Sequence, residues 1–441
     1  MKRVKKLLAI AIVLPFLITL AFSNGLNLNG LGSKAVAMGG AFVALADDYS
    51  AIFWNPAGIA QFNQKTFGFF GEDIIPSGTY KFDITLPIIG PFNLVNAKTE
   101  GKHYLNATCA YYHPVSENLV AGFGVYVPSG LGAKWNGEDF KNISENTAYK
   151  WESYINIITF SPALAFKISE QVFFGATLNI NYGTFNVDMH AGTTVVPLPP
   201  PFFFTTVDLG QYEEKLKGWG YGATFGILVK PSEMFSLGAT FRTPTKMKFK
   251  GDASISNLNL LGANKTSDVD RDVTWPMWIA GGVAIKPVEN LTITADVQYT
   301  NWKKIEVLKA DYKDPVWKQI MAISGDDTRE MHWKDATQIR FGAEYRVNSL
   351  ALRAGYYNDP APAPDKTMNV LLPNYDFSAV AFGIGYAANG LYIDFALEYL
   401  KAKDRDIDYS KTLLDPEWKT AMPGVHTMKI WAPSFSIGYN F

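Results

Sequence analysis

The final segment of the chain alternates between two kinds of residue, and this alternation constrains the fold more than any other feature of the sequence. One parity carries small or polar residues, and the other carries Trp431, Phe435, Ile437, Tyr439 and Phe441. Successive side chains of a β-strand point to opposite faces, so a period of two predicts a strand with one apolar face. The same pattern returns at 337–345 and 391–399, which predicts a sheet built from many such strands.

The connections between these strands distinguish a closed barrel from a soluble sandwich, which also alternates. About 14 strand segments follow residue 65, and their junctions are alternately tight and long. The tight junctions fall at 114–118, 169–171, 231–234, 287–290, 348–349 and 389–390. The long ones fall at 76–102, 128–149, 190–210, 253–271, 309–332, 359–375 and 404–427. Because short turns at one end and long loops at the other are typical of outer-membrane barrels, we predict an antiparallel transmembrane β-barrel of about 14 strands.

Composition excludes several other classes of protein. The formal net charge is −1, which argues against nucleic acid as a partner. Charged residues make up 18% of the chain, below the roughly 25% of soluble domains, so many apolar side chains are expected to face lipid. Cys109 is the only cysteine, so no intramolecular disulfide can form. After residue 23 no uncharged apolar run reaches the ~18 residues that a helical span needs.

The N-terminus has the three parts of a secretory signal peptide. Basic residues at positions 2–6 precede an apolar stretch at 7–20, and Ala21-Phe22-Ser23 forms a small-x-small cleavage site. We therefore expect cleavage after Ser23 and export beyond the inner membrane. Together with the barrel pattern, this predicts a location in the outer membrane of a Gram-negative-type bacterium.

Residues 24–64 do not alternate and are predicted to form a separate unit. The stretch 24–40 is rich in glycine, 41–48 reads as a short helix, and Asn55-Pro56-Ala57-Gly58 is a turn signal. The lumen of a barrel this wide is not filled by the wall's own side chains, so another segment must occlude it. We expect residues 24–64 to form a hatch inside a barrel made by residues 65–441.

The hatch sequence resembles that of the FadL/TodX family, the long-chain fatty acid and hydrocarbon importers of Gram-negative outer membranes. The resemblance rests on 30–41, 46–48, 54–58, 333–335, 340–345, 352–356, 360–364 and 372–374, with scattered matches elsewhere. It implies a 14-stranded barrel with an N-terminal hatch and a luminal pocket for fatty acids or other hydrophobic compounds. It also implies lateral exit where the third strand bends inward. We expect release by hatch movement, with passage to the periplasm as the alternative exit, and passive uptake, because the sequence has no nucleotide-binding motif.

The same resemblance assigns roles to residues of the hatch and of the third strand. That strand corresponds to 119–127, where Gly122 and Gly124 are candidates for the bend. The alternative is that these glycines only relieve crowding against the hatch. In the family the extreme N-terminus reaches into the pocket, which places Leu26 there at a position usually aromatic. Asn55, Pro56 and Ala57 are expected to belong to the hatch gate.

Two other groups of residues are candidates for ligand contact. Arg340 and Arg353 fall on the luminal parity and are candidates to hold a carboxylate, the alternative being structural salt bridges in the lumen. The apolar loop 195–204, with Phe202, Phe203 and Phe204, would capture a ligand outside the membrane. The alternative for this loop is that it folds into the barrel mouth.

The expected partners are a hydrophobic small molecule and outer-membrane lipid, without nucleic acid, and the barrel is expected to be a monomer. No cofactor, metal site or catalytic residue is expected, because the five histidines match no nucleophile or metal-binding spacing. The competing interpretations are a FadL-like barrel that acts as a protein-secretion shuttle, and a general polar pore. A lipid-hydrolysing barrel is a third, less favoured alternative.

Overall fold

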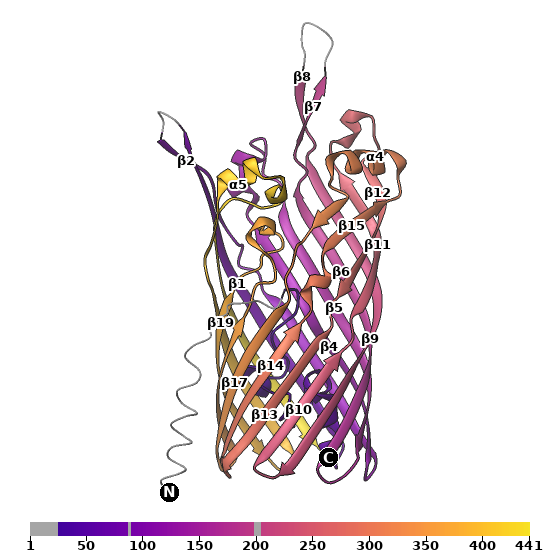
Figure 1. The fold of residues 1–441 in the computed structure, drawn as a ribbon, viewed down its shortest axis with the longest axis vertical. Helices are drawn as coiled ribbons and strands as arrows, with labels where there is room; N and C mark the ends of the chain where they lie inside the picture. Colours follow the sequence, from indigo (N-terminus) through magenta and orange to yellow (C-terminus); the bar gives the residue numbers. More distant parts are fainter. Residues whose placement is uncertain (1–24, 87–89, 198–203) are drawn as a thin grey trace.

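The computed structural model describes residues 25–86, 90–197 and 204–441. They form a tall antiparallel barrel that is closed by pairing of β1 (Thr66–Leu86) with β22 (Gly424–Asn440) (Figure 1). The predicted 14-strand antiparallel barrel is confirmed. The predicted signal peptide lies outside the described residues. Among the described helices, none has the length and apolar character of a membrane-crossing helix.

The strands follow one another around the wall in chain order. After β1 come β3 (Tyr104–Ser116), β4 (Leu119–Trp135), β5 (Trp151–Lys167), β6 (Val172–His190), β9 (Gln211–Ser232), β10 (Phe235–Arg242) with β11 (Thr245–Ile255), and β12 (Thr266–Trp275) with β13 (Trp278–Val288). These are followed by β14 (Leu291–Thr300) with β15 (Val307–Tyr312), β16 (Thr328–Glu330) with β17 (Ala336–Val347), β18 (Leu350–Asp359), β19 (Phe377–Ala388), β20 (Leu391–Ala402), β21 (Arg405–Ile407) and β22.

Two strands predicted as continuous are interrupted at the same height in the wall. The segments predicted at 235–252 and 272–286 break at Pro244 and Pro276, so that Arg242 pairs with Trp278 and Thr245 with Trp275 on either side. Proline has no N–H to give to the ladder, which accounts for both interruptions.

The loops predicted as long carry regular structure of their own above the barrel. β2 (Gly90–Lys98) pairs with the end of β1, and β7 (Thr193–Pro197) pairs with β8 (Phe204–Asp208) in a hairpin that rises farthest from the barrel (Figure 1). The helical elements there are α4 (Pro315–Ser324), α5 (Tyr409–Leu414), η3 (Gly137–Ile143), η4 (Leu258–Leu261), η5 (Trp302–Lys304), η6 (Asp365–Thr367) and η7 (Pro416–Trp418).

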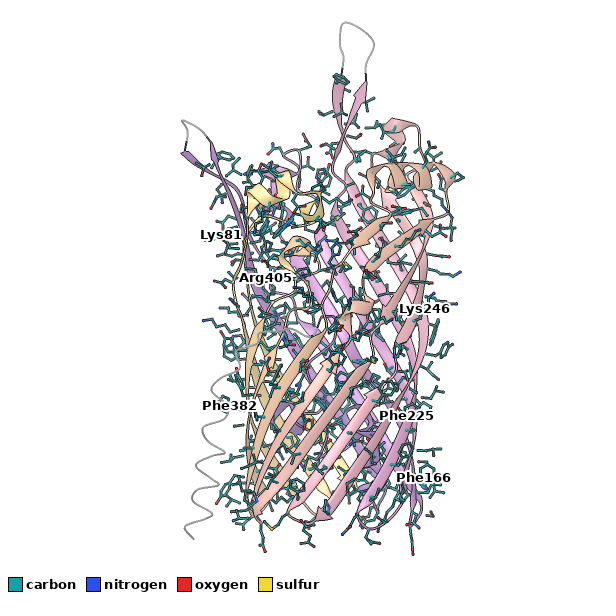
Figure 2. The ribbon with its side chains drawn as sticks, in the orientation of Figure 1. Lys81, Phe166, Phe225, Lys246, Phe382 and Arg405 are labelled. Atoms are coloured by element: carbon teal, nitrogen blue, oxygen red, sulfur yellow. The ribbon has the colours of Figure 1, made fainter. Side chains whose placement is uncertain are left out.

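The two parities of each strand face two different environments, as the sequence predicts. Phe166, Phe225 and Phe382 project from the outside of the lower barrel, and Phe382 is 61% exposed (Figure 2). The luminal parity carries buried charged residues: Asp296, Arg340, Glu344, Arg353, Asp394 and Glu398. Charges on the outer face would cost about 2 to 4 kcal/mol each near the bilayer midplane, so their inward placement is consistent with a lipid-facing exterior.

The N-terminal segment, residues 25–65, lies inside the lower barrel and is almost entirely buried from residue 30 to residue 60. It contains α2 (Ser33–Ala37), α3 (Ala51–Trp54) and η2 (Pro56–Gln61). The helix predicted over 41–48 is wrong, because backbone groups of this stretch bond to other partners. The N–H of Val43 donates to Asp296 Oδ2 over 2.8 Å, and its carbonyl accepts from Asn55 Nδ2 over 2.8 Å.

Inward-facing glycines of the wall form a seat for this segment. A Cβ atom at any of them would press against the N-terminal segment, in several cases against its backbone. They are Gly68, Gly124, Gly175, Gly226, Gly238, Gly282, Gly342, Gly355 and Gly383. Their strands surround the segment on all sides, so the wall is shaped to let its backbone approach closely.

Two adjacent glycines of β13 test whether this seat stabilises the barrel. Gly282→Val would push a side chain against Asp296 and Ala44, and we expect it to destabilise the folded state by about 1 to 3 kcal/mol through overpacking. Gly281→Val is the matched control, because the nearest atom to its Cβ would be 3.9 Å away. Samples are incubated at increasing temperatures before electrophoresis, and the temperature at which the band of the folded barrel disappears measures the effect. Equal temperatures for both variants would contradict a fitted seat.

Candidate functional site

A luminal cavity lies on the extracellular side of the N-terminal segment. Its floor is the start of that segment, from Gly25 to Gly30, and its walls come from strands at both ends of the chain. The apolar part of the lining includes Leu28, Ile74, Val127, Pro373, Phe377, Leu400 and Ile430. A largely apolar cavity with a few polar groups is typical of a small-molecule site.

The cavity reaches a slit in the barrel wall between β3 and β4. Pairing of these strands stops at Thr108 and Tyr126, although β3 still pairs with β1 to Tyr104, and β4 with β5 to Trp135. The register of β4 against β5 shifts between Tyr126 and Ser129, so β4 carries one extra residue there. Such a bulge bends a strand and ends its pairing locally.

The upper end of the slit is closed by contacts across it. Thr99 forms an isolated bridge with Trp135, and the N–H of Glu100 donates to the Lys134 carbonyl over 2.8 Å. Leu105 is 82% exposed at the slit and also lines the cavity. The slit is therefore a bounded opening in the wall rather than a frayed edge.

Tyr104 lies across this opening. A Cβ atom on Gly132 of β4 would clash with the Tyr104 ring, so the ring rests on the facing strand. The same ring stacks on Tyr154 with centroids 6.4 Å apart, and Lys102 Nζ lies 5.4 Å from its centroid. Lys102 also pairs with Glu152 of β5. These contacts hold the aromatic ring between the cavity and the outside.

The start of the N-terminal segment is attached to the bend in β4. Asn27 forms a bridge with Ser129, and the N–H of Leu28 donates to the Pro128 carbonyl over 3.0 Å. Ser129 Oγ donates to Asn27 Oδ1 over 2.9 Å and accepts from Trp275 Nε1 over 2.8 Å. The cavity floor and the bent strand are thus directly linked.

Of the two predicted arginines, Arg340 lies close to the cavity but does not line it. It lines a smaller adjoining cavity of about 250 Å³, together with Arg242. Its guanidinium donates to the carbonyls of Asn29 and Gly39 over 3.0 Å each and to Gln338 over 2.8 Å. Its donors therefore tie the N-terminal segment to β17.

Arg353 lies near the periplasmic end of the lumen, outside the residues that line the large cavity. It donates to Glu344 Oε2 over 2.6 Å and to Asp394 Oδ1 over 2.5 Å, and all three side chains are buried. Lys34 of the N-terminal segment bonds Asp47 over 2.7 Å and lies 4.0 Å from Glu344. This arrangement corresponds to the structural salt bridge that the sequence left as an alternative.

The glycines proposed for the bend of the third strand are not at the bend. Gly122 and Gly124 lie in a regularly paired part of β4, and the register shift lies at Val127 and Pro128. The glycines instead make room for neighbours, Gly122 for the Tyr112 ring and Gly124 for the Ile52 side chain of the N-terminal segment. A proline breaks a ladder because it has no N–H, whereas glycine only leaves space.

The remaining predicted residues are spread over three regions. Leu26 is buried, 5% exposed, in an apolar cluster that also contains Trp302. Asn55 donates to Ile227 of β9 over 3.0 Å, and Pro56 and Ala57 pack on Gly175 of β6. Phe204 begins β8 and is 71% exposed, far above the cavity, and Phe202 and Phe203 lie outside the described residues.

Sequence reasoning missed the polar groups of the cavity. Glu72, Asn106 and Asn156 line it; the first two lie on the luminal parity of their strands, whereas Asn156 lies on the opposite parity of β5, paired with Gly130 of the bent strand. The available signal was Pro128, which interrupts an alternating strand. No feature of the sequence brings β1, β3 and β5 together around that proline. Among the described residues, no group of three or more His, Cys, Asp or Glu side chains could hold a metal ion.

A lipid-facing barrel with a filled lower lumen and an apolar cavity above it defines an outer-membrane transport barrel. A family model described as "Outer membrane protein transport protein (OMPP1/FadL/TodX)" matches residues 15–441. The chain belongs to this family, as its sequence predicted, and it is located in the outer membrane. The family comprises transporters and channels.

Individual relatives are distant in sequence but similar over nearly their whole length. The long-chain fatty acid transport protein of Escherichia coli O6:H1 is 24% identical over 432 residues, covering 89% of this chain and 90% of the relative. The crystal structure of a Pseudomonas aeruginosa FadL homologue has a TM-score of 0.77 at 16% identity, covering 95% of this chain and all of that one. The Pseudomonas putida toluene transporter TodX has a TM-score of 0.70 at 18% identity, covering 94% and 99%.

The position of Arg353 generates a prediction about ligand selectivity. Arg353→Ala leaves Glu344 and Asp394 buried without their partner, which costs about 3 to 5 kcal/mol of stability. We therefore expect the same fractional loss of binding for a fatty acid and for a neutral hydrocarbon, together with a lower unfolding temperature. Equilibrium binding of both ligands to the purified variant measures this. A loss confined to the fatty acid would instead make Arg353 a carboxylate-binding residue.

Proposed function

We propose that this protein carries hydrophobic small molecules passively across the outer membrane, through the luminal cavity and sideways through the slit between β3 and β4. The observation that carries the proposal is that one cavity extends from the floor at Gly25–Gly30 to the opening beside Leu105 and Val127. Names of relatives point the same way, since they describe transport of long-chain fatty acids and of toluene.

The physical chemistry of the bilayer favours such a route. The sugar-coated outer leaflet hinders apolar solutes, whereas burial of each methylene in an apolar cavity gains about 0.8 kcal/mol. A ligand that leaves sideways passes from this cavity directly into the hydrocarbon region and never crosses the polar end of the lumen. No energy source is required, because the ligand moves down its own concentration gradient.

Residues 24–64 act in this proposal as a hatch that keeps the lower lumen closed. Their burial, the glycine seat and the bonds from Asn55 and Arg340 support a hatch whose body stays in place. The first residues of the hatch are held less firmly than its body, because several between Gly25 and Asn29 are only partly buried and border the cavity. Hatch movement is therefore assigned to this short stretch, which is also bonded to the bend of β4.

The other parts of the proposal concern partners. The exposed hairpin β7–β8, with Phe204 in the pair farthest from the barrel, is assigned to capture of ligands outside the membrane. The barrel works as a monomer in outer-membrane lipid, without catalysis and without nucleic acid. A general pore is the main alternative, and a purified sample in a planar bilayer would reveal it by steady conductance. Release of a partner protein from intact cells that carry this barrel would instead indicate a secretion shuttle.

Deletion of Pro128 tests sideways exit. The deletion removes the extra residue of β4, so that the strand can pair with β3 past Tyr126 and close the slit. We expect uptake of a hydrophobic compound by cells to fall to the level of cells without the protein. Pro128→Ala is the matched control, because it keeps the number of residues and hence the bulge. Normal uptake by a folded deletion variant would contradict sideways exit.

A further inference from the structure

The polar groups that line the large cavity are amides, phenols and carboxyl groups. Three buried carboxyl groups line it, those of Glu72, Asp359 and Glu398, with exposed fractions of 8%, 3% and 6%. No Lys, Arg or His is among the described residues that line it. An anion brought into this cavity would find no cation in the lining to offset the hydration that it loses.

Several of these groups have unused hydrogen-bonding capacity. Asn106 is 3% exposed and donates through Nδ2 to Glu72 Oε2 over 3.1 Å, which leaves its Oδ1 buried without a partner. Asn156 donates to the Tyr154 hydroxyl over 3.0 Å, and its Oδ1 is likewise unpartnered. The hydroxyl of Tyr104, the residue that lies across the slit, also has no partner. Buried polar atoms without partners are costly, so they mark places where a ligand can gain binding free energy.

We infer that the cavity takes an uncharged hydrophobic compound whose polar end donates a hydrogen bond, such as a long-chain alcohol, in preference to a fatty acid anion. This inference rests on the proposed transport function and specifies its ligand class. The hydroxyl donates to Asn106 Oδ1 or Asn156 Oδ1, and the chain lies along the apolar lining toward the slit. A plain hydrocarbon fits the same space but leaves those oxygens unsatisfied.

The cationic part of the lumen does not reverse this preference. Arg242 and Arg340 line the separate cavity of about 250 Å³ beside Asn27–Asn29. Arg242 donates to the Phe53 carbonyl over 2.9 Å, and its guanidinium lies 4.5 Å from the Phe53 ring centroid. Arg340 donates to Asn29, Gly39 and Gln338 as described above. Both guanidinium groups are thus held by carbonyls and aromatic rings of the hatch and wall.

Binding of three ligands of equal chain length to the purified full chain tests the inference. The probes are radiolabelled 1-decanol, decane and decanoate, measured at pH 7.5 in one detergent. We expect the alcohol to bind about fivefold tighter than the alkane, from one net hydrogen bond, and at least ~10-fold tighter than the acid. The double variant Asn106→Leu/Asn156→Leu should remove the advantage of the alcohol and keep the alkane affinity, and the two single variants show which oxygen accepts the bond. Asn259→Leu, an exposed loop change outside the cavity, is the matched control.

The possible results separate this inference from the proposed function. Binding of decane with no gain for decanol would overturn the inference and leave hydrophobic transport standing. The inference would also be overturned if decanoate bound as tightly as decanol and lost its affinity in Arg340→Gln. That result would place the polar end of the ligand at the arginines. If variants with Asn106→Leu do not fold, the order of affinities of the three probes for the unchanged protein decides. Absence of binding for all three probes would remove the proposed function as well.

Discussion

The requirement that every backbone N–H and C=O be paired within hydrocarbon determines most of this structure. It forces the strands to close on themselves, and β1 meets β22 to remove the last free edge. A barrel of this width cannot fill its lumen with wall side chains alone. The N-terminal segment fills the lower part, and the inward glycines of the wall exist because its backbone has to come close. Closure of the barrel, the filled lower lumen and the glycine seat are therefore successive consequences of one constraint.

The slit between β3 and β4 is notable because it departs from that constraint. Past Thr108 and Tyr126 the two strands no longer pair with each other, and each keeps only its outer neighbour. Part of the lost pairing is replaced from inside, since Leu28 donates to the Pro128 carbonyl and Asn27 bridges Ser129. The stability of the opening thus depends on the same residues that form the cavity floor. In the proposed route, a ligand that displaces them also changes what holds the bent strand, which would couple occupancy of the cavity to exit.

The sequence predicted the fold well because its main signals are local. Alternation such as that of 431–441 depends only on neighbours in the chain, and the tight turns follow from Pro, Asn and Gly. The bend in β4 was misplaced because Gly122 and Gly124 suggested flexibility, whereas the register shift depends on how β4 meets β3 and β5. The helix expected over 41–48 failed for a similar reason, because Asp296 and Asn55 take the backbone groups that a helix would use.

The candidate site could be predicted only in part, because the sequence does not show which luminal charges are already satisfied. Arg353 and Arg340 were the natural choices for a fatty acid, yet in the structure both already donate to carboxylates, carbonyls or the Gln338 side chain. No signal in the sequence singles out Asn106, yet its Oδ1 is buried without a hydrogen-bond partner. Charged groups with partners lie along the N-terminal segment, whereas Tyr104, Asn106 and Asn156 each bring an unpartnered polar atom to the cavity. In a lumen that water reaches poorly, unpartnered polar atoms indicate the chemistry of the ligand better than charged groups do. A ligand can lower the free energy of an unpartnered atom by bonding to it, whereas a charged group that already has its partners gains little from a ligand.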